Sequence, residues 1–192
     1  MSTRLDKNMA WQVSTKRKTA HKDCAKDKKG EQNRMQHVFL VGAKSLGAYG
    51  GYETFINKLT EYHQSNPDIK YHVAVKANGQ GASLPNGVEV VEGRYTYHNA
   101  DCFQISIPEK LGPAQAIYFD CAALKKSIEI IKEEEISSPI VYIMTCRIGP
   151  FYNSFCRSIH KLGGRVFLNP DGECEIIWTT REKPDFMRVC AA

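Results

Sequence analysis

The sequence lacks the patterns that mark several large classes of protein. It contains neither a Walker A loop nor a GxGxxG fingerprint, which argues against an ATPase and against an ordinary NAD enzyme. No stretch approaches the roughly 20 apolar residues that span a bilayer. The first residues carry charges but not the continuous apolar segment of a secretory signal. These absences indicate a cytoplasmic protein, and they leave room for peripheral contact with a membrane face.

Cysteines are present but not in metal-binding patterns. The chain has seven, with no CxxC pair and no Cys/His grouping at zinc spacing, so no metal site is expected. An odd number without an export signal favours a reducing compartment. Cys102, Cys121, Cys146 and Cys156 lie among apolar residues, where a cysteine usually serves as a small buried hydrophobe.

The positive charge is concentrated at the amino terminus. The formal net charge is +5, yet residues 1–35 alone hold ten Lys and Arg against four acidic residues. The rest of the chain is therefore close to neutral. Because residues 1–35 also lack hydrophobic periodicity, we predict a disordered basic tail. A solvated leader is favoured over an arm that contacts nucleic acid or lipid, so no nucleic-acid partner is expected.

From residue 36 onward, apolar runs of strand length alternate with helical periodicity. We expect a hairpin over 94–108 that turns near Asn99, and the runs that predict single strands are 37–42, 71–77, 87–93, 139–146 and 165–172. Continuous apolar strands separated by amphipathic helices predict a parallel sheet covered on both faces. The fold class is thus α/β, a Rossmann-like domain over 36–172. Residues 173–192 show no convincing period and form a divergent segment too short for a second such domain.

Three amphipathic helices are expected between these strands. Each is predicted from apolar residues spaced three or four apart, and a helix that Pro113 opens is the longest. The expected apolar stripes are Tyr52, Phe55, Ile56, Leu59 and Tyr62; Ile117, Cys121, Leu124, Ile128 and Ile131; and Phe151, Phe155, Ile159 and Leu162.

The loop after the first strand, VGAKSLGAYGGYETF (41–55), has the most informative sequence. In an open parallel sheet, ligands bind at the carboxyl ends of the strands. Gly50 and Gly51 stand at the start of a helix, where two missing β-carbons let main-chain amides approach a phosphate. The same pair could equally serve only to make a tight turn from strand to helix. The residues alone leave both interpretations open.

Four segments together resemble the amino-terminal domain of bacterial rhamnosyltransferases. They are VFLVGAKSLGAYGGYETFINKLTEY, IYFDCAALKKSIEIIKE, PIVYIMTCRIGPF and IHKLGGRVFLNPDG. More broadly, they resemble the GT-B family 4-like glycosyltransferases that assemble capsular and O-antigen polysaccharides. The resemblance covers 36–172. It implies transfer of a sugar from a nucleotide-sugar, with dTDP-rhamnose as the expected donor, to a lipid-linked glycan acceptor, without a metal or a resident cofactor.

The resemblance also implies roles for residues of the loop. The amino-terminal domain of such enzymes mainly shapes the acceptor side of a cleft, and the carboxyl-terminal domain holds the nucleotide. Gly50 and Gly51 would meet the donor diphosphate, with Tyr49 and Tyr52 lining the cleft. Glu53 would either contact the acceptor or act as a capping partner at the first turn of the helix, where a carboxylate also favours the helix dipole.

Two further residues are candidates at the ends of later strands. Arg147 directly follows the run 139–146, where it could pair with an acceptor or donor phosphate or hold a loop by a salt bridge. Asp171 could orient an acceptor hydroxyl, although Asn169-Pro170-Asp171-Gly172 is also favourable turn chemistry.

The resemblance stops after Gly172. The family continues there with a His-Glu-Trp and a basic, aromatic stretch, whereas this chain has Glu173-Cys174-Glu175. We therefore expect that the chain lacks the donor-binding half and has negligible transferase activity alone. It would be either a truncated relic or half of a split enzyme that a complementing carboxyl-terminal polypeptide completes. The alternative is a non-catalytic α/β binding module whose basic tail contacts nucleic acid or anionic lipid.

Overall fold

The computed structural model describes residues 35–47 and 50–169. The chain divides into two units, residues 1–33 and 34–192, and the description below concerns the second. Its elements are β1 (Gln36–Val41), α1 (Gly51–Tyr62), β2 (Ile69–Lys76), β3 (Arg94–Tyr97), β4 (Ala100–Ile105), η1 (Glu109–Ala114), α2 (Gln115–Glu133), β5 (Ile140–Ile143), η2 (Gly149–Phe151), α3 (Tyr152–Lys161) and β6 (Arg165–Leu168).

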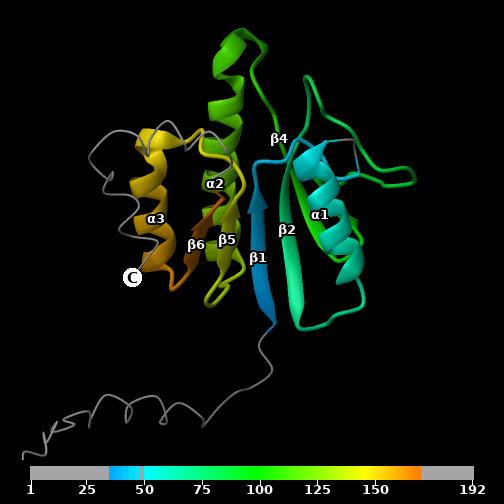
Figure 1. Ribbon diagram of the computed structural model, residues 1–192. Helices are drawn as coiled ribbons and strands as arrows, with labels where there is room; N and C mark the ends of the chain where they lie inside the picture. Colours follow the sequence, from blue (N-terminus) through cyan, green and yellow to red (C-terminus); the bar gives the residue numbers. More distant parts are fainter. Residues whose placement is uncertain (1–34, 48–49, 170–192) are drawn as a thin grey trace, which may run out of the picture. The chain divides into compact units, whose positions relative to one another are not determined.

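The strands form one sheet in the order β3-β4-β2-β1-β5-β6. All neighbouring strands run parallel except β3 and β4, which pair antiparallel as the predicted hairpin. In Figure 1, α1 lies on one side of the sheet and α2 and α3 lie on the other. The α/β, Rossmann-like fold class expected from the sequence is confirmed.

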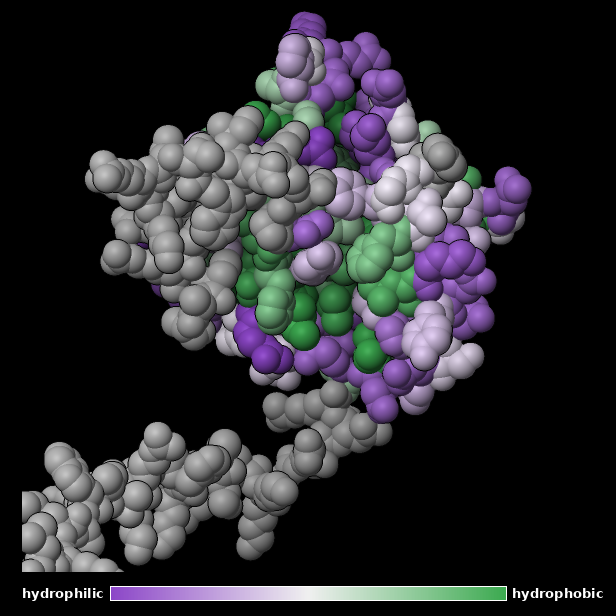
Figure 2. All heavy atoms as spheres, viewed as in Figure 1, coloured by the Kyte–Doolittle hydropathy of each residue, from purple (hydrophilic) through white to green (hydrophobic). Residues whose placement is uncertain are grey.

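The core consists of two apolar layers, one on each face of the sheet. Figure 2 shows hydrophobic residues in the middle of the face viewed in Figure 1, with hydrophilic residues above them and to their right. Successive side chains of a strand point to opposite faces, so Phe39 and Val41 pack in the layer beneath α2 and α3. Leu40 packs in the layer that includes Ile56 of α1. Because both faces are buried, β1 has the continuous apolar run from which the strand was predicted.

The strand predicted over 87–93 is wrong. In this segment, Val91 forms an isolated bridge with Arg94, with two backbone hydrogen bonds of 2.9 Å around a turn, and the Gly93 carbonyl accepts one of 2.8 Å from the Gln104 amide. Val88 and Val90 instead pack their side chains against the layer beneath α1. The apolar pattern of this segment therefore reflects burial of side chains without a neighbouring strand.

The buried face of α1 is rotated relative to the predicted apolar stripe. Phe55 and Tyr62 are 47% and 84% exposed, while the buried positions of α1 are Glu53, Ile56 and Thr60. Polar side chains can occupy a buried face when their hydrogen bonds are satisfied, and the Thr60 hydroxyl donates to the Ile56 carbonyl.

The longest helix begins two residues after Pro113. Gly112 departs from helical geometry, so η1 and α2 meet at a kink and α2 starts at Gln115. Ile117 from the predicted stripe is 42% exposed, whereas the neighbouring Phe119 and Asp120 are buried. Cys121 and Ile128 are partly buried, and Leu124 and Ile131 lie in the core as expected.

Some of the sequence-based expectations lie outside the described residues. These are the basic tail apart from Met35, the segment 173–192, and the candidates Tyr49 and Asp171. Within the described part, no helix is both long and apolar enough to cross a bilayer. None of the four described cysteines forms a disulfide, and Cys102 and Cys156 are buried as expected.

Candidate functional site

The carboxyl ends of β1, β2 and β5 meet at one edge of the sheet, as parallel pairing requires. Gly42 follows β1 at this edge with φ +123°, a conformation that favours glycine. An added β-carbon there would lie 3.1 Å from the Thr145 side chain and 3.2 Å from that of Met144. Glycine at this position thus lets the loop after β1 pass close against the end of β5.

The loop after β1 is tied to its neighbours through Lys44. The Lys44 amide donates a hydrogen bond of 2.9 Å to the carboxylate of Glu53 in α1. Its carbonyl accepts one of 2.8 Å from the Lys76 amide at the end of β2. Glu53 is 8% exposed. It therefore fixes the loop to the helix, and its contact with an acceptor stays a prediction.

Gly50 and Gly51 occupy two different environments. The Glu53 carboxylate packs directly over Gly50, where a β-carbon would clash with it, so close packing explains this glycine. Gly51 is the exposed first residue of α1. Among the described residues outside its own turn, nothing lies within 4 Å of the place its β-carbon would take. Packing does not explain the second glycine.

Arg147 is positioned by a buried carboxylate. Its Nε lies 3.3 Å from Oδ2 of Asp120, and the Thr145 hydroxyl donates a hydrogen bond of 2.7 Å to the same oxygen. Burial raises the pKa of Asp120, against the hydrogen bond from Thr145 and the charges of Arg147 and Lys76. The salt bridge considered from the sequence is therefore present. One third of the Arg147 side chain remains exposed.

A cavity of about 220 Å³ opens beside this ion pair. Three cationic side chains line it, namely Lys44, Lys76 and Arg147. The remaining lining residues are Gly42, Gln80, Gly112, Pro113, Gln115, Ala116 and Phe119. We call this cavity the cationic pocket. It joins the loop after β1, the end of β2 and the start of α2.

The positive charge of the cationic pocket affects the pKa of Lys76. Burial lowers the pKa of this amine, and the positive charges of Lys44 and Arg147 lower it further. The carboxylates of Asp120 and Glu53 oppose these effects only in part. The pocket thus presents an excess of positive charge at the edge where α/β sheets bind ligands.

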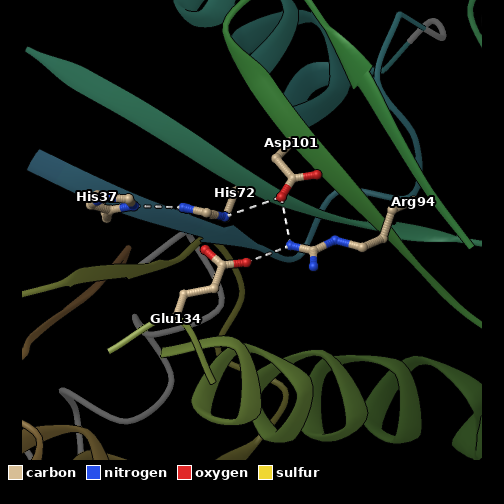
Figure 3. Close-up of polar contacts among 5 residues, drawn as sticks. All are labelled: His37, His72, Arg94, Asp101 and Glu134. Atoms are coloured by element: carbon tan, nitrogen blue, oxygen red, sulfur yellow. Dashed lines mark hydrogen bonds and ion pairs between the residues drawn. The ribbon is translucent and has the colours of Figure 1, made fainter. Parts of the chain in front are cut away.

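A second polar cluster lies on the face of the sheet that α2 covers, and Figure 3 shows its contacts. His37 Nδ1 lies 2.9 Å from His72 Nε2, and His72 Nδ1 lies 3.6 Å from Asp101. The same Asp101 oxygen accepts a bond of 2.6 Å from Arg94, which also contacts Glu134 at 3.0 Å. We call these five residues the histidine network. Each acidic or guanidinium group in it faces an opposite charge.

The structure brings together only part of the site predicted from the sequence. Arg147 lines the cationic pocket, whereas Gly50, Gly51 and Glu53 lie on the α1 side of the Lys44 loop and do not line it. Tyr52 packs partly buried against the layer beneath α1, so the structure does not place it in this pocket.

Lys44, Lys76 and Asp120 were missed from the sequence. Lys76 lies at the end of a predicted strand. The rule that ligands bind at the carboxyl ends of strands identified Arg147 and could have identified Lys76 as well. Asp120 stands one position from an apolar residue of the predicted stripe, so its burial could not be inferred without the correct helix phase. The described residues contain no group of three or more His, Cys, Asp or Glu side chains placed to hold a metal ion.

The fold and the pocket define the class of protein, a Rossmann-like α/β domain with an anion-attracting cavity at the carboxyl edge of its sheet. The chain belongs to the family described as Domain of unknown function (DUF1972), whose model matches residues 35–185. Domains of this family are found in glycosyltransferase-associated proteins. The match continues past Gly172 into the carboxyl-terminal segment. No curated protein matches the sequence.

Proposed function

We propose that this domain forms the acceptor-side half of a GT-B glycosyltransferase. It would work with a donor-binding half to transfer a sugar, with dTDP-rhamnose as the expected donor, to a lipid-linked glycan of a cell-surface polysaccharide. The occurrence of the family in glycosyltransferase-associated proteins supports this function. So does the position of the pocket at the ligand-binding edge of a Rossmann-like sheet.

The observation that carries the proposal is the exposed glycine that begins α1, Gly51. The amino terminus of α1 opens at the carboxyl edge, and a side chain at Gly51 would meet nothing within 4 Å among described residues outside its own turn. Main-chain amides and the helix dipole at the start of a helix favour a phosphate. The arrangement suits a diphosphate that approaches the main chain closely.

This arrangement would act on the leaving group of the transfer. The acceptor oxygen forms a bond to the anomeric carbon of the sugar, and the bond from that carbon to the diphosphate oxygen breaks. The nucleoside diphosphate departs with the electron pair. Amides directed at the developing negative charge would lower the barrier more than they stabilise the bound donor. No residue is assigned as the base that accepts the proton of the acceptor hydroxyl.

The test is a series of substitutions at Gly51 in the chain joined to a donor-binding domain. Gly51→Ala and Gly51→Val should fold normally, because their side chains enter open space. We expect transfer of labelled rhamnose from dTDP-rhamnose to lipid-linked glycan to fall tenfold or more for Gly51→Val and less for Gly51→Ala. Thermal unfolding of both variants verifies the fold.

A second measurement uses the chain as it is. Amide hydrogen exchange should slow at residues 42–53 and 145–148 when the lipid-linked acceptor is added. Full transfer by Gly51→Val, together with no protection at this edge, would refute the proposed function.

A further inference from the structure

The cationic pocket holds more positive charge than its own carboxylates neutralise. Arg147 has an ion-pair partner in Asp120. Among the described residues, neither Lys44 nor Lys76 has a carboxylate within ion-pair distance of its amine. The Glu53 carboxylate, which is the other acid acting on Lys76, is hydrogen-bonded to the main chain of Lys44.

Lys76 is held in place although it has no carboxylate partner. Its amine donates to the Gln80 carbonyl at 3.2 Å and lies 5.9 Å from the centre of the Phe119 ring. A lysine that is fixed and partly desolvated has already lost much of its side-chain entropy, so binding a ligand there costs less. Arg147 is likewise fixed, through Asp120 and Thr145.

The dimensions of the pocket limit what it can bind. Its volume of about 220 Å³ corresponds to about seven water molecules in the liquid. That space suits one or two phosphate groups, with the remainder of a larger ligand extending outside. Two amines and a guanidinium supply the charge-assisted donors that phosphate oxygens accept.

We infer that Lys44, Lys76 and Arg147 form a binding site for the diphosphate group of a substrate ester, separate from the helix end at Gly51. The identity of the ester rests on the proposed function. Two esters carry this chemistry in the proposed reaction, the nucleotide-sugar donor and the lipid-linked acceptor. The site lies wholly within the described domain, so binding does not require a donor-binding half.

The experiment titrates the full chain with inorganic pyrophosphate by isothermal calorimetry at constant ionic strength. We expect Lys44→Gln and Lys76→Gln each to weaken binding at least tenfold, since each removes one charge-assisted contact. Lys76→Arg, which keeps the charge, should recover most of the affinity.

Lys70→Gln is the matched control. Lys70 lies in the same strand as Lys76 but at the opposite end of β2, and it carries the same charge. Its substitution should leave binding unchanged. Equal weakening by Lys70→Gln and Lys76→Gln, or binding by Lys76→Gln as tight as that of the parent chain, would overturn the inference. The first result would assign pyrophosphate binding to general electrostatic attraction, and the second would place it away from Lys76.

Two further ligands distinguish the source of the diphosphate. dTDP represents the donor and a short-chain isoprenoid diphosphate represents the acceptor, and each competes with pyrophosphate. The ester that competes more strongly, and loses that advantage in Lys76→Gln, identifies the substrate bound in the pocket. Failure of both to compete would overturn the inference.

The transfer assay separates this inference from the proposed function. Unchanged transfer by Lys76→Gln in the joined protein would refute the role of the pocket and leave the proposed function intact. Absence of transfer by the parent protein, with lysine-dependent pyrophosphate binding retained, would refute only the proposed function.

Discussion

The histidine network and the cationic pocket are both partly buried polar clusters, but they balance charge differently. In the network, Asp101 lies between His72 and Arg94, and Arg94 also contacts Glu134. In the pocket, three cations are opposed by carboxylates that are already engaged with Thr145 or with the main chain.

This difference separates a structural cluster from a binding cluster. Charges removed from water are tolerated when the protein supplies their partners. A cluster that satisfies itself adds to stability or specificity of the fold, whereas unbalanced charge in a cavity reduces stability unless a ligand completes it. We therefore expect substitutions in the network to change stability and substitutions in the pocket to change ligand affinity.

The largest effect is expected from Asp101→Asn. Burial would raise the pKa of Asp101, but hydrogen bonds and charge from His72 and Arg94 lower it overall, which shows that the fold favours the ionised form. The amide oxygen can still accept a hydrogen bond from Arg94, but the negative charge that pairs with the guanidinium is removed, and the ion pair with the partly exposed Glu134 remains. We expect a loss of about 2 to 3 kcal/mol in the free energy of unfolding, measured with urea, and unchanged pyrophosphate affinity.

The control for this substitution is Glu61→Gln, which breaks the exposed ion pair of Glu61 with Lys58 and should not change stability measurably. A similar small effect for Asp101→Asn would contradict the structural role of the network.

Asp120→Asn is expected to change pyrophosphate affinity, which Asp101→Asn leaves unchanged, and to lower the free energy of unfolding by less. The asparagine oxygen can still accept from Thr145, but the negative charge beside Arg147 is gone. We expect pyrophosphate to bind several-fold more tightly, because a carboxylate no longer competes for the cations of the pocket. Stability should fall by about 1 kcal/mol, because the ion pair of Asp120 with the partly exposed Arg147 is lost. Weaker pyrophosphate binding would show that Asp120 serves mainly to hold Arg147.

The smallest effect concerns the pH dependence of His37. Burial lowers its pKa, the nearby His72 and Lys70 lower it further, and Glu134 opposes them. A lowered pKa means that the unfolded chain takes up a proton first as the pH falls. The contribution of His37 is complete above the unfolded value of about 6.5 and is lost as the pH falls from there through the folded value.

Thermal unfolding at pH 7.5 and pH 5.5 measures this contribution. The melting temperature should fall more for the parent chain than for His37→Gln over this interval. An equal fall for both would show that the proton-sensitive group lies elsewhere.

The fold was predictable because burial on both faces leaves a simple pattern in the sequence. The apolar run of β1 and the alternation around Asn99 identify their strands directly. The segment 87–93 has the same kind of pattern, but Val88 and Val90 are only partly buried, and their segment forms no strand of the sheet. A sequence shows which side chains avoid water and does not show whether the backbone finds a partner.

The site was less predictable because its residues are distant in sequence. Lys44 and Lys76 are 32 positions apart and come together because β1 and β2 are parallel neighbours that end at the same edge. Arg147 was found by its place after a strand. Whether Asp120 is buried depends on the rotation of α2 about its axis. The apolar stripe predicts a buried face that is shifted by about one residue from the face that the structure buries.

The helix α2 connects the two polar clusters physically. It carries Asp120 in its second turn, and Glu134 follows its last residue, so about 21 Å of rigid helix separate the two carboxylates at 1.5 Å per residue. A small slide of α2 along its axis would shift both ends by the same amount. The apolar face of α2, with Phe119, Leu124 and Ile131 buried against the sheet, opposes such a slide. The helix therefore keeps the two carboxylates at a fixed separation, so a change in one cluster should leave the geometry of the other intact.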